Sequence, residues 1–233
     1  HYPLRRQRQM CIRDRYAPLV SPGSAPSAVT GFPVSLAGEA TDLITGSLST
    51  RWSFSAGTGA AVFDDASKLM TTATFDRFGP HMLRLEATNS IATVFREMSL
   101  LVAANPNFWA DWQGLQWPGV SAEDVISPNA DPDRDGLLNL VEWACGLDPK
   151  NPDASPCRIS SNGSELGFDY QLAASRQGMT CVVEVSDDLS PGSWTSEGVK
   201  RARIQQGDPE QWRATCDTPP RDQRFFRIRI VKP

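Results

Sequence analysis

Oxygen-bearing residues recur at alternate positions between residues 131 and 142, at the spacing of a cation-binding loop. The predicted ligands are Asp131, Asp133, Asp135, Leu137 through its carbonyl, Asn139 and Glu142. A large hard cation takes about six to eight oxygens, and a tight loop delivers them from alternate residues. Gly136 permits the sharp turn after the aspartates. The pattern therefore predicts bound Ca²⁺ rather than Mg²⁺, which seldom uses an all-protein cage.

The alternative interpretation is a solvated acidic turn that precedes a helix without any metal. Four carboxylates in one loop repel one another, each pair by on the order of 1 kcal/mol or more at about 4 Å, and Arg134 offsets only part of this repulsion. A divalent cation would remove the conflict.

A short helix must position the last ligands. Apolar residues at helical spacing predict that it starts inside the loop, buries one face and ends at Gly146. These residues are Leu137, Leu138, Leu140, Val141, Ala144 and Cys145. On the entering side, Pro128 and Pro132 leave room for only a short turn through Val125 and Ile126. The sequence thus predicts half of an EF-hand.

Residues 131–149 resemble the calcium loops of dockerins and thrombospondin type 3 repeats. They resemble more closely the D-x-D-x-D-G-x-x-N-x-x-E-[YW]-x-x-G-x-D-P element near the carboxyl ends of many exported bacterial proteins. Dockerins carry two such loops and this chain has one, so the resemblance does not extend to cohesin binding.

The sequence offers few residues from which a catalytic site could be formed. Outside His1, His81 is the only histidine, and its parity with Leu83 and Leu85 places it on the buried face of a strand. The sequence has no H-E-x-x-H motif, no paired C-x-x-C and no glycine-rich phosphate loop. We therefore expect a protein that is not an enzyme.

Alternating apolar residues predict short strands over residues 31–104, with turn signals between them. They are Val34 and Leu36, Trp52 and Phe54, Phe63, Ala73 and Phe75, Leu83, Leu85 and Ala87, and Met98, Leu100 and Val102. Strands at this spacing indicate an antiparallel sandwich. The order of residues 36–38, 51–52, 71–75 and 79–87 resembles PKD-like, immunoglobulin-like modules of bacterial surface proteins, although His81 stands where such modules usually have Tyr.

Aromatic residues crowd the connector over residues 105–156. Trp109, Trp112 and Trp117 fit a buried stripe that packs against the calcium helix, with Trp143 as a further member. The alternative is an exposed surface that stacks on sugars.

Alternating residues return over residues 157–233 and predict a second, smaller antiparallel β domain. Residues 183–189 with Trp194, and residues 224–228, resemble the carboxyl-terminal β module that commonly follows the calcium element in exported bacterial proteins.

Four cysteines follow residue 140, and they allow three pairings. Cys181 and Cys216 fall in predicted strands of one domain, which favours a bond between them and leaves Cys145 to pair with Cys157. Either bond suits an oxidising compartment. The alternative, buried free thiols that act as small apolar residues, stays open.

The first fifteen residues need separate treatment, because residues 9–15 look like a translated sequencing adapter and not like native protein. The alternative is a basic arm. We expect the native part to begin near Tyr16, with any export signal missing. Residues 1–15 carry five arginines and one aspartate, so without them the net charge falls from −4 to −8. This acidity argues against nucleic acid, and no apolar stretch is long enough for a membrane span.

The combined prediction is a mainly β chain from the exterior of a bacterial cell. Its predicted segments are an artefact at 1–15, a linker at 16–30, a PKD-like β-sandwich at 31–104, a helical calcium-binding connector at 105–156 and a smaller β domain at 157–233. We expect a monomeric structural or adhesion region of a larger secreted or cell-surface protein, with a protein or glycan partner. The alternative is a carbohydrate-binding or anchoring accessory region of a secreted polysaccharide-degrading enzyme.

Overall fold

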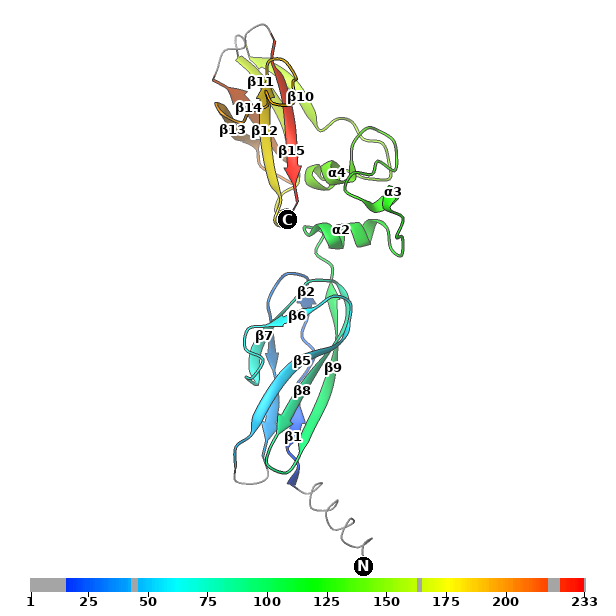
Figure 1. The fold of residues 1–233 in the computed structure, drawn as a ribbon, viewed down its shortest axis with the longest axis vertical. Coiled ribbons are helices and arrows are strands. Elements are labelled where there is room, and N and C mark those ends of the chain that lie inside the picture. Colours follow the sequence, from blue (N-terminus) through cyan, green and yellow to red (C-terminus); the bar gives the residue numbers. More distant parts are fainter. Residues whose placement is uncertain (1–15, 43–45, 163–164, 218–222, 233) are drawn as a thin grey trace, which may run out of the picture. The chain divides into compact units, whose positions relative to one another are not determined.

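The computed structural model describes residues 16–42, 46–162, 165–217 and 223–232. The chain divides into two compact units, the first ending at Asn105 and the second beginning at Pro106. Both are built mainly from antiparallel β-sheets, as expected (Figure 1). The adapter-like stretch and Cys11 lie outside the described residues. None of the described helices has both the length and the apolar character needed to cross a bilayer.

The described residues of the first unit form nine strands. They are β1 (Leu19–Ser21), β2 (Ala28–Val29), β3 (Val34–Ala37), β4 (Glu39–Thr41), β5 (Ser49–Gly57), β6 (Ala61–Phe63), β7 (Met70–Phe75), β8 (Gly79–Thr88) and β9 (Thr93–Ala103). One sheet has the order β2-β9-β8-β5, a second has the order β3-β7-β6, and β1 pairs with β4. All pairs are antiparallel except β2 with β9.

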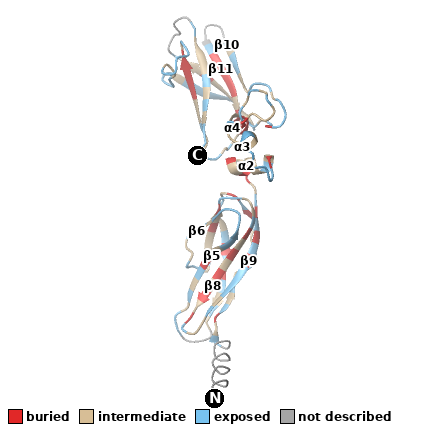
Figure 2. Ribbon diagram, turned by 45° about the vertical axis from the view of Figure 1, so that its right-hand side comes forward, coloured by how far each residue is buried: buried red, intermediate tan, exposed pale blue. Residues whose placement is uncertain are grey.

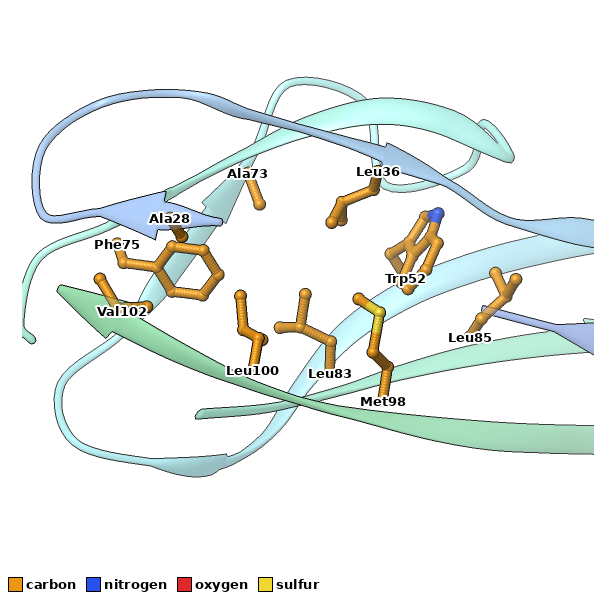
Figure 3. Close-up of a cluster of buried hydrophobic side chains, with 10 residues drawn as sticks. All are labelled: Ala28, Leu36, Trp52, Ala73, Phe75, Leu83, Leu85, Met98, Leu100 and Val102. Carbon is orange, nitrogen blue, oxygen red and sulfur yellow. The ribbon is translucent and has the colours of Figure 1, made fainter. Parts of the chain in front are cut away.

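The core of this unit lies between the two larger sheets (Figure 3). Its buried residues are Ala28, Leu36, Trp52, Ala73, Phe75, Leu83, Leu85, Met98, Leu100 and Val102. Both sheets contribute, so the unit is a β-sandwich, and the alternating apolar residues predicted to face inward do so. Along β8, buried and half-buried residues alternate strictly after Pro80 (Figure 2).

Two features of the first unit bear on the sequence predictions. The prediction of a linker at residues 16–30 is wrong, because β1 and β2 lie within this segment and Ala28 is buried in the core. His81 is buried as predicted. Its Nδ1 lies 3.0 Å from the Gly79 carbonyl oxygen, and its ring packs against Phe54 and Phe75.

Within the described part of the second unit, the chain forms three helices and six strands. They are α2 (Trp109–Gln116), α3 (Glu123–Ile126), α4 (Asn139–Cys145), β10 (Cys157–Asn162), β11 (Glu165–Leu172), β12 (Thr180–Ser186), β13 (Val199–Gln205), β14 (Glu210–Cys216) and β15 (Phe225–Val231). A four-stranded sheet has the order β10-β11-β14-β13, and β12 pairs with β15. Phe168, Tyr170, Leu172, Val183 and Ala214 form the core of these strands.

The tryptophans of the connector form a separate buried cluster. Trp109, Trp112 and Trp117 pack with Trp143 of α4, and the rings of Trp109 and Trp143 meet edge to face at 5.7 Å. Arg176 links two segments beside this cluster. Its Nε donates to the Trp143 carbonyl, and its Nη1 donates to the Pro106 carbonyl. The packing role is therefore confirmed, and the burial of these side chains counts against sugar stacking on them.

The buried face of α4 differs from the prediction. Leu138 is 39% exposed, because the helix begins one residue later and turns Asn139, Glu142 and Trp143 inward. Gly146 ends the helix in the left-handed conformation at φ 72°, as predicted.

The four cysteines from Cys145 onward are free thiols. The favoured pair is not formed, and the two residues belong to different sheets: Cys181 lies on β12 opposite Ile230 of β15, and Cys216 lies on β14 opposite Val199 of β13. Burial, with a smaller contribution from the nearby Cys181, raises the pKa of Cys157 to about 11. The open alternative, thiols that act as small apolar residues, matches this arrangement.

Candidate metal centre

The acidic loop lies between α3 and α4 and is closed by backbone hydrogen bonds. The Asn139 N–H donates to the Ala130 carbonyl at 2.9 Å, and the Leu140 N–H donates to the Pro128 carbonyl at 3.1 Å. These bonds bring the end of the loop back to its start. The first turn of α4 therefore lies beside the three aspartates.

Tight turns within the loop hold the aspartate side chains. Asp131 accepts the N–H groups of Arg134 and Gly136 at 2.8 and 3.0 Å, and Asp135 accepts that of Leu137 at 2.7 Å. One oxygen from each of Asp131, Asp133 and Asp135 lies within 4.8 Å of the others. Like charges this close repel, so the arrangement suits a cation among them.

The backbone conformation explains why glycine stands in the loop. Gly136 has φ 91° and Arg134 has φ 65°, both in the left-handed region. An added Cβ at Gly136 would meet no atom within 4 Å. The requirement for glycine is therefore conformational and not a matter of space.

Asn139, a further predicted ligand, is the first residue of α4 and has a buried side-chain amide. Its Nδ2 donates to the carbonyls of Val125 and Ser127 at 2.8 and 2.9 Å, which fixes the orientation of the amide. The residue is fully buried, and its Oδ1 has no hydrogen-bond partner among the described residues. A buried acceptor without a donor is costly, so Oδ1 is suited to bind a cation.

Glu142 is the strongest indication of a metal. Its side chain is fully buried, and neither carboxylate oxygen has a hydrogen-bond partner within the described part of the chain. Burial, together with the charges of Asp133, Asp135, Asp131 and Asp153, raises its pKa to about 8. Both oxygens therefore belong to one electrostatic cluster with the loop aspartates.

The pKa of Asp133 is also raised, first by burial and then by the charges of Asp135 and Asp131, against a lowering hydrogen bond from the Asp135 backbone. Its Oδ2 is a further buried oxygen without a described partner. A bound divalent cation would stabilise the ionised form of these carboxylates and satisfy their open oxygens.

The structure thus brings together the side chains of Asp131, Asp133 and Asp135, and the Glu142 carboxylate interacts electrostatically with all three. Asn139 is buried at the start of α4, with its amide bound to Val125 and Ser127. Leu137 lies between Asp135 and Asn139 in the chain, its N–H donates to Asp135, and its predicted contribution is a backbone carbonyl. The buried Glu142, whose carboxylate oxygens have no hydrogen-bond partner among the described residues, is a feature that a solvated acidic turn would not require. The residues present fit a hard cation with oxygen ligands.

Sequence reasoning missed Asp153. Its N–H donates to Asp135 Oδ2 at 2.7 Å, and its own Oδ2 accepts the Asp148 N–H at 2.8 Å. The turn that contains Pro149 and Pro152 therefore folds back onto the loop and orients Asp135. The signal in the sequence is an aspartate directly after a proline-rich turn.

Comparisons with known proteins identify no family. No family model matches the chain, and no curated protein matches it. Among solved structures, a marsupial T cell receptor is 8% identical with a TM-score of 0.24, over 92% of this chain and 64% of that one. The bacterial integrin-binding protein invasin is 8% identical with a TM-score of 0.25, over 94% of this chain and 37% of that one. The chain thus spans less than two thirds of either protein, and similarity at this level indicates neither a family nor a function.

Proposed function

We propose that this protein is a non-enzymatic, calcium-stabilised structural or adhesion region of a larger secreted or cell-surface bacterial protein. The observation that carries the proposal is Glu142, a buried carboxylate with two unpartnered oxygens beside three clustered aspartates. In this proposal the first unit is a PKD-like sandwich, and residues 131–142 form an EF-hand-like loop that ends in a short helix.

The proposed ion has a structural role. It neutralises the loop carboxylates and fixes α4, whose Trp143 is completely buried in the tryptophan cluster. Extracellular modules hold calcium with a Kd of about 10⁻⁴ to 10⁻³ M, which suits a permanently calcium-rich exterior. The buried, aromatic surroundings of His81 support the non-enzymatic part of the proposal.

Calcium titration calorimetry on the full chain tests the proposal. We expect one site of the stated affinity, at least tenfold weaker in Asp133→Asn and Glu142→Gln, with little competition from equimolar magnesium. Asp124→Asn, at an exposed position of α3, is the matched control and should bind like wild type. No measurable calcium binding by the wild-type chain, or equal loss in the control, would refute the proposal.

A further inference from the structure

A polar groove of about 430 Å³ lies in the second unit, over the four-stranded sheet. Its lining includes Gln171 of β11, Gln211 of β14 and Gln205 of β13. The sheet order places these three strands side by side. The groove therefore lies on the face of a sheet and not at its edge.

The three glutamines form one row across the sheet. Gln171 is directly opposite Gln211, and Gln211 is directly opposite Gln205. Directly opposed side chains on one face have Cβ atoms roughly 4.5 to 5.5 Å apart. The neighbouring Tyr170 and Trp212 pack with the core, so Gln171 and Gln211 point to the outer face. Gln205 follows a bulge in β13 and lines the same groove.

These carboxamides are available to a ligand. Each carries two donor hydrogens and an acceptor oxygen. Gln171 Nε2 donates to the Cys145 carbonyl at 3.0 Å, which anchors one end of the row. The side chains of Gln205 and Gln211 make no hydrogen bond with any described residue, and both are accessible to solvent.

A second row of ionic side chains lies beside the first. Arg158, Asp169 and Arg213 are opposite one another in register on β10, β11 and β14. Asp169 is 4% exposed and accepts Nε and Nη2 of Arg213 at 2.6 and 2.9 Å, while the Arg158 Nε lies 3.4 Å from it. Arg158 and Asp169 line the groove, and the Arg158 side chain is 78% exposed, so this row offers a ligand one accessible guanidinium.

We propose that this groove binds a saccharide chain, with the glutamine row as its main hydrogen-bonding surface. Sugar hydroxyls are both donors and acceptors, and they match carboxamides at regular spacing. Peptide strands bind by adding to a sheet edge and by filling apolar pockets, whereas this groove lies on a face and is mostly polar. Single-stranded nucleic acid requires aromatic stacking platforms, and the ring of Tyr170 instead stacks on Phe168 in the core.

The proposal is independent of the metal centre, because no predicted calcium ligand lines the groove. Its test uses the full chain in calcium-containing buffer and titrates soluble neutral glucan oligosaccharides and, separately, oligogalacturonate. We expect binding in at least one arm. Gln211→Ala and the more exposed Gln205→Ala should each weaken it about tenfold, whereas Gln177→Ala, at an exposed position outside the groove, should not change it.

The two arms identify the kind of saccharide. If oligogalacturonate binds, Arg158→Gln should weaken it about tenfold, and if only the neutral glucan binds, Arg158→Gln should have less than a twofold effect. Absence of binding in both arms at 10 mM saccharide overturns the proposal. Binding that survives in both glutamine variants, or an unstructured peptide that competes for the same residues, overturns it as well.

Discussion

Replacing Glu142 with glutamine should stabilise the protein when calcium is absent. The substitution keeps the shape of the side chain and removes a carboxylate that is fully buried among aspartates. The new amide can donate hydrogen bonds to those aspartates. Glu142 is therefore expected to destabilise the folded protein when no cation is bound.

The magnitude follows from the two pKa values of Glu142. The unfolded chain loses this proton near its ordinary value of 4.5, whereas the folded chain keeps it until about pH 8. Below pH 4.5 the protonated side chain makes its full contribution to the unfolding free energy. This contribution falls progressively as the pH rises from 4.5 to about 8. At pH 7 the loss is about 3 kcal/mol, at roughly 1.4 kcal/mol for each pH unit over which only the unfolded chain is ionised.

Urea unfolding between pH 5 and pH 9, in EDTA and in calcium, measures this effect. In EDTA at pH 7, Glu142→Gln should exceed wild type by up to about 3 kcal/mol, and its stability should vary less with pH. Calcium at about 100 times the wild-type Kd should stabilise wild type by about 2.7 kcal/mol and the variant, which binds at least tenfold more weakly, by at most about 1.4 kcal/mol. Glu123→Gln, exposed on α3, should match wild type throughout. The reasoning is wrong if Glu142→Gln is less stable than wild type in EDTA, or if calcium stabilises both equally.

Further substitutions probe the elements around the site and the first unit. Gly136→Ala should weaken calcium binding, because φ 91° costs an L residue roughly 1 to 2 kcal/mol; Gly192→Ala, in open space at an ordinary φ, should bind calcium normally. Trp143→Ala should lower the unfolding free energy of the second unit by about 3 to 5 kcal/mol in urea, since the ring is completely buried. Gly38→Ala would place a Cβ 2.5 Å from Leu85 Cδ2 and 2.8 Å from Trp52, and thermal unfolding should show a loss of about 1 to 3 kcal/mol, with Gly46→Ala unaffected.

Local patterns predicted much of the fold. Alternating residues such as Leu83 and Leu85 identified the buried face of β8, because a strand alternates its side chains whatever its partner. The prediction for residues 16–30 failed because their structure depends on long-range pairing and not on a local pattern. Their proline, serine and glycine content indicates an extended segment, but the pairing of β2 with β9, more than 70 residues later, depends on tertiary structure. The same limit applies to Cys181 and Cys216, which share a domain but lie in different sheets.

The candidate site was predictable where spacing alone brings ligands together. The loop residues and Glu142 lie within twelve residues, and a turn followed by a helix gathers them. Asp153 was not predictable in this way, since its contact with Asp135 depends on the path of the turn after α4. The glutamine row could not be predicted from the sequence, because Gln171, Gln211 and Gln205 become neighbours only through the register of three strands.

The short helix α4 connects the metal centre to the core of the second unit. Seven residues are too few for a helix to be stable by itself in water. Successive helical residues point about 100° apart, so Glu142 can face the aspartates while Trp143 enters the tryptophan cluster. Packing on one side therefore holds the carboxylate in an environment that penalises its charge, and a cation on the other side removes that penalty. In the proposed metal centre, the same tertiary contacts that order the helix thus create the electrostatic cost that a bound cation would remove.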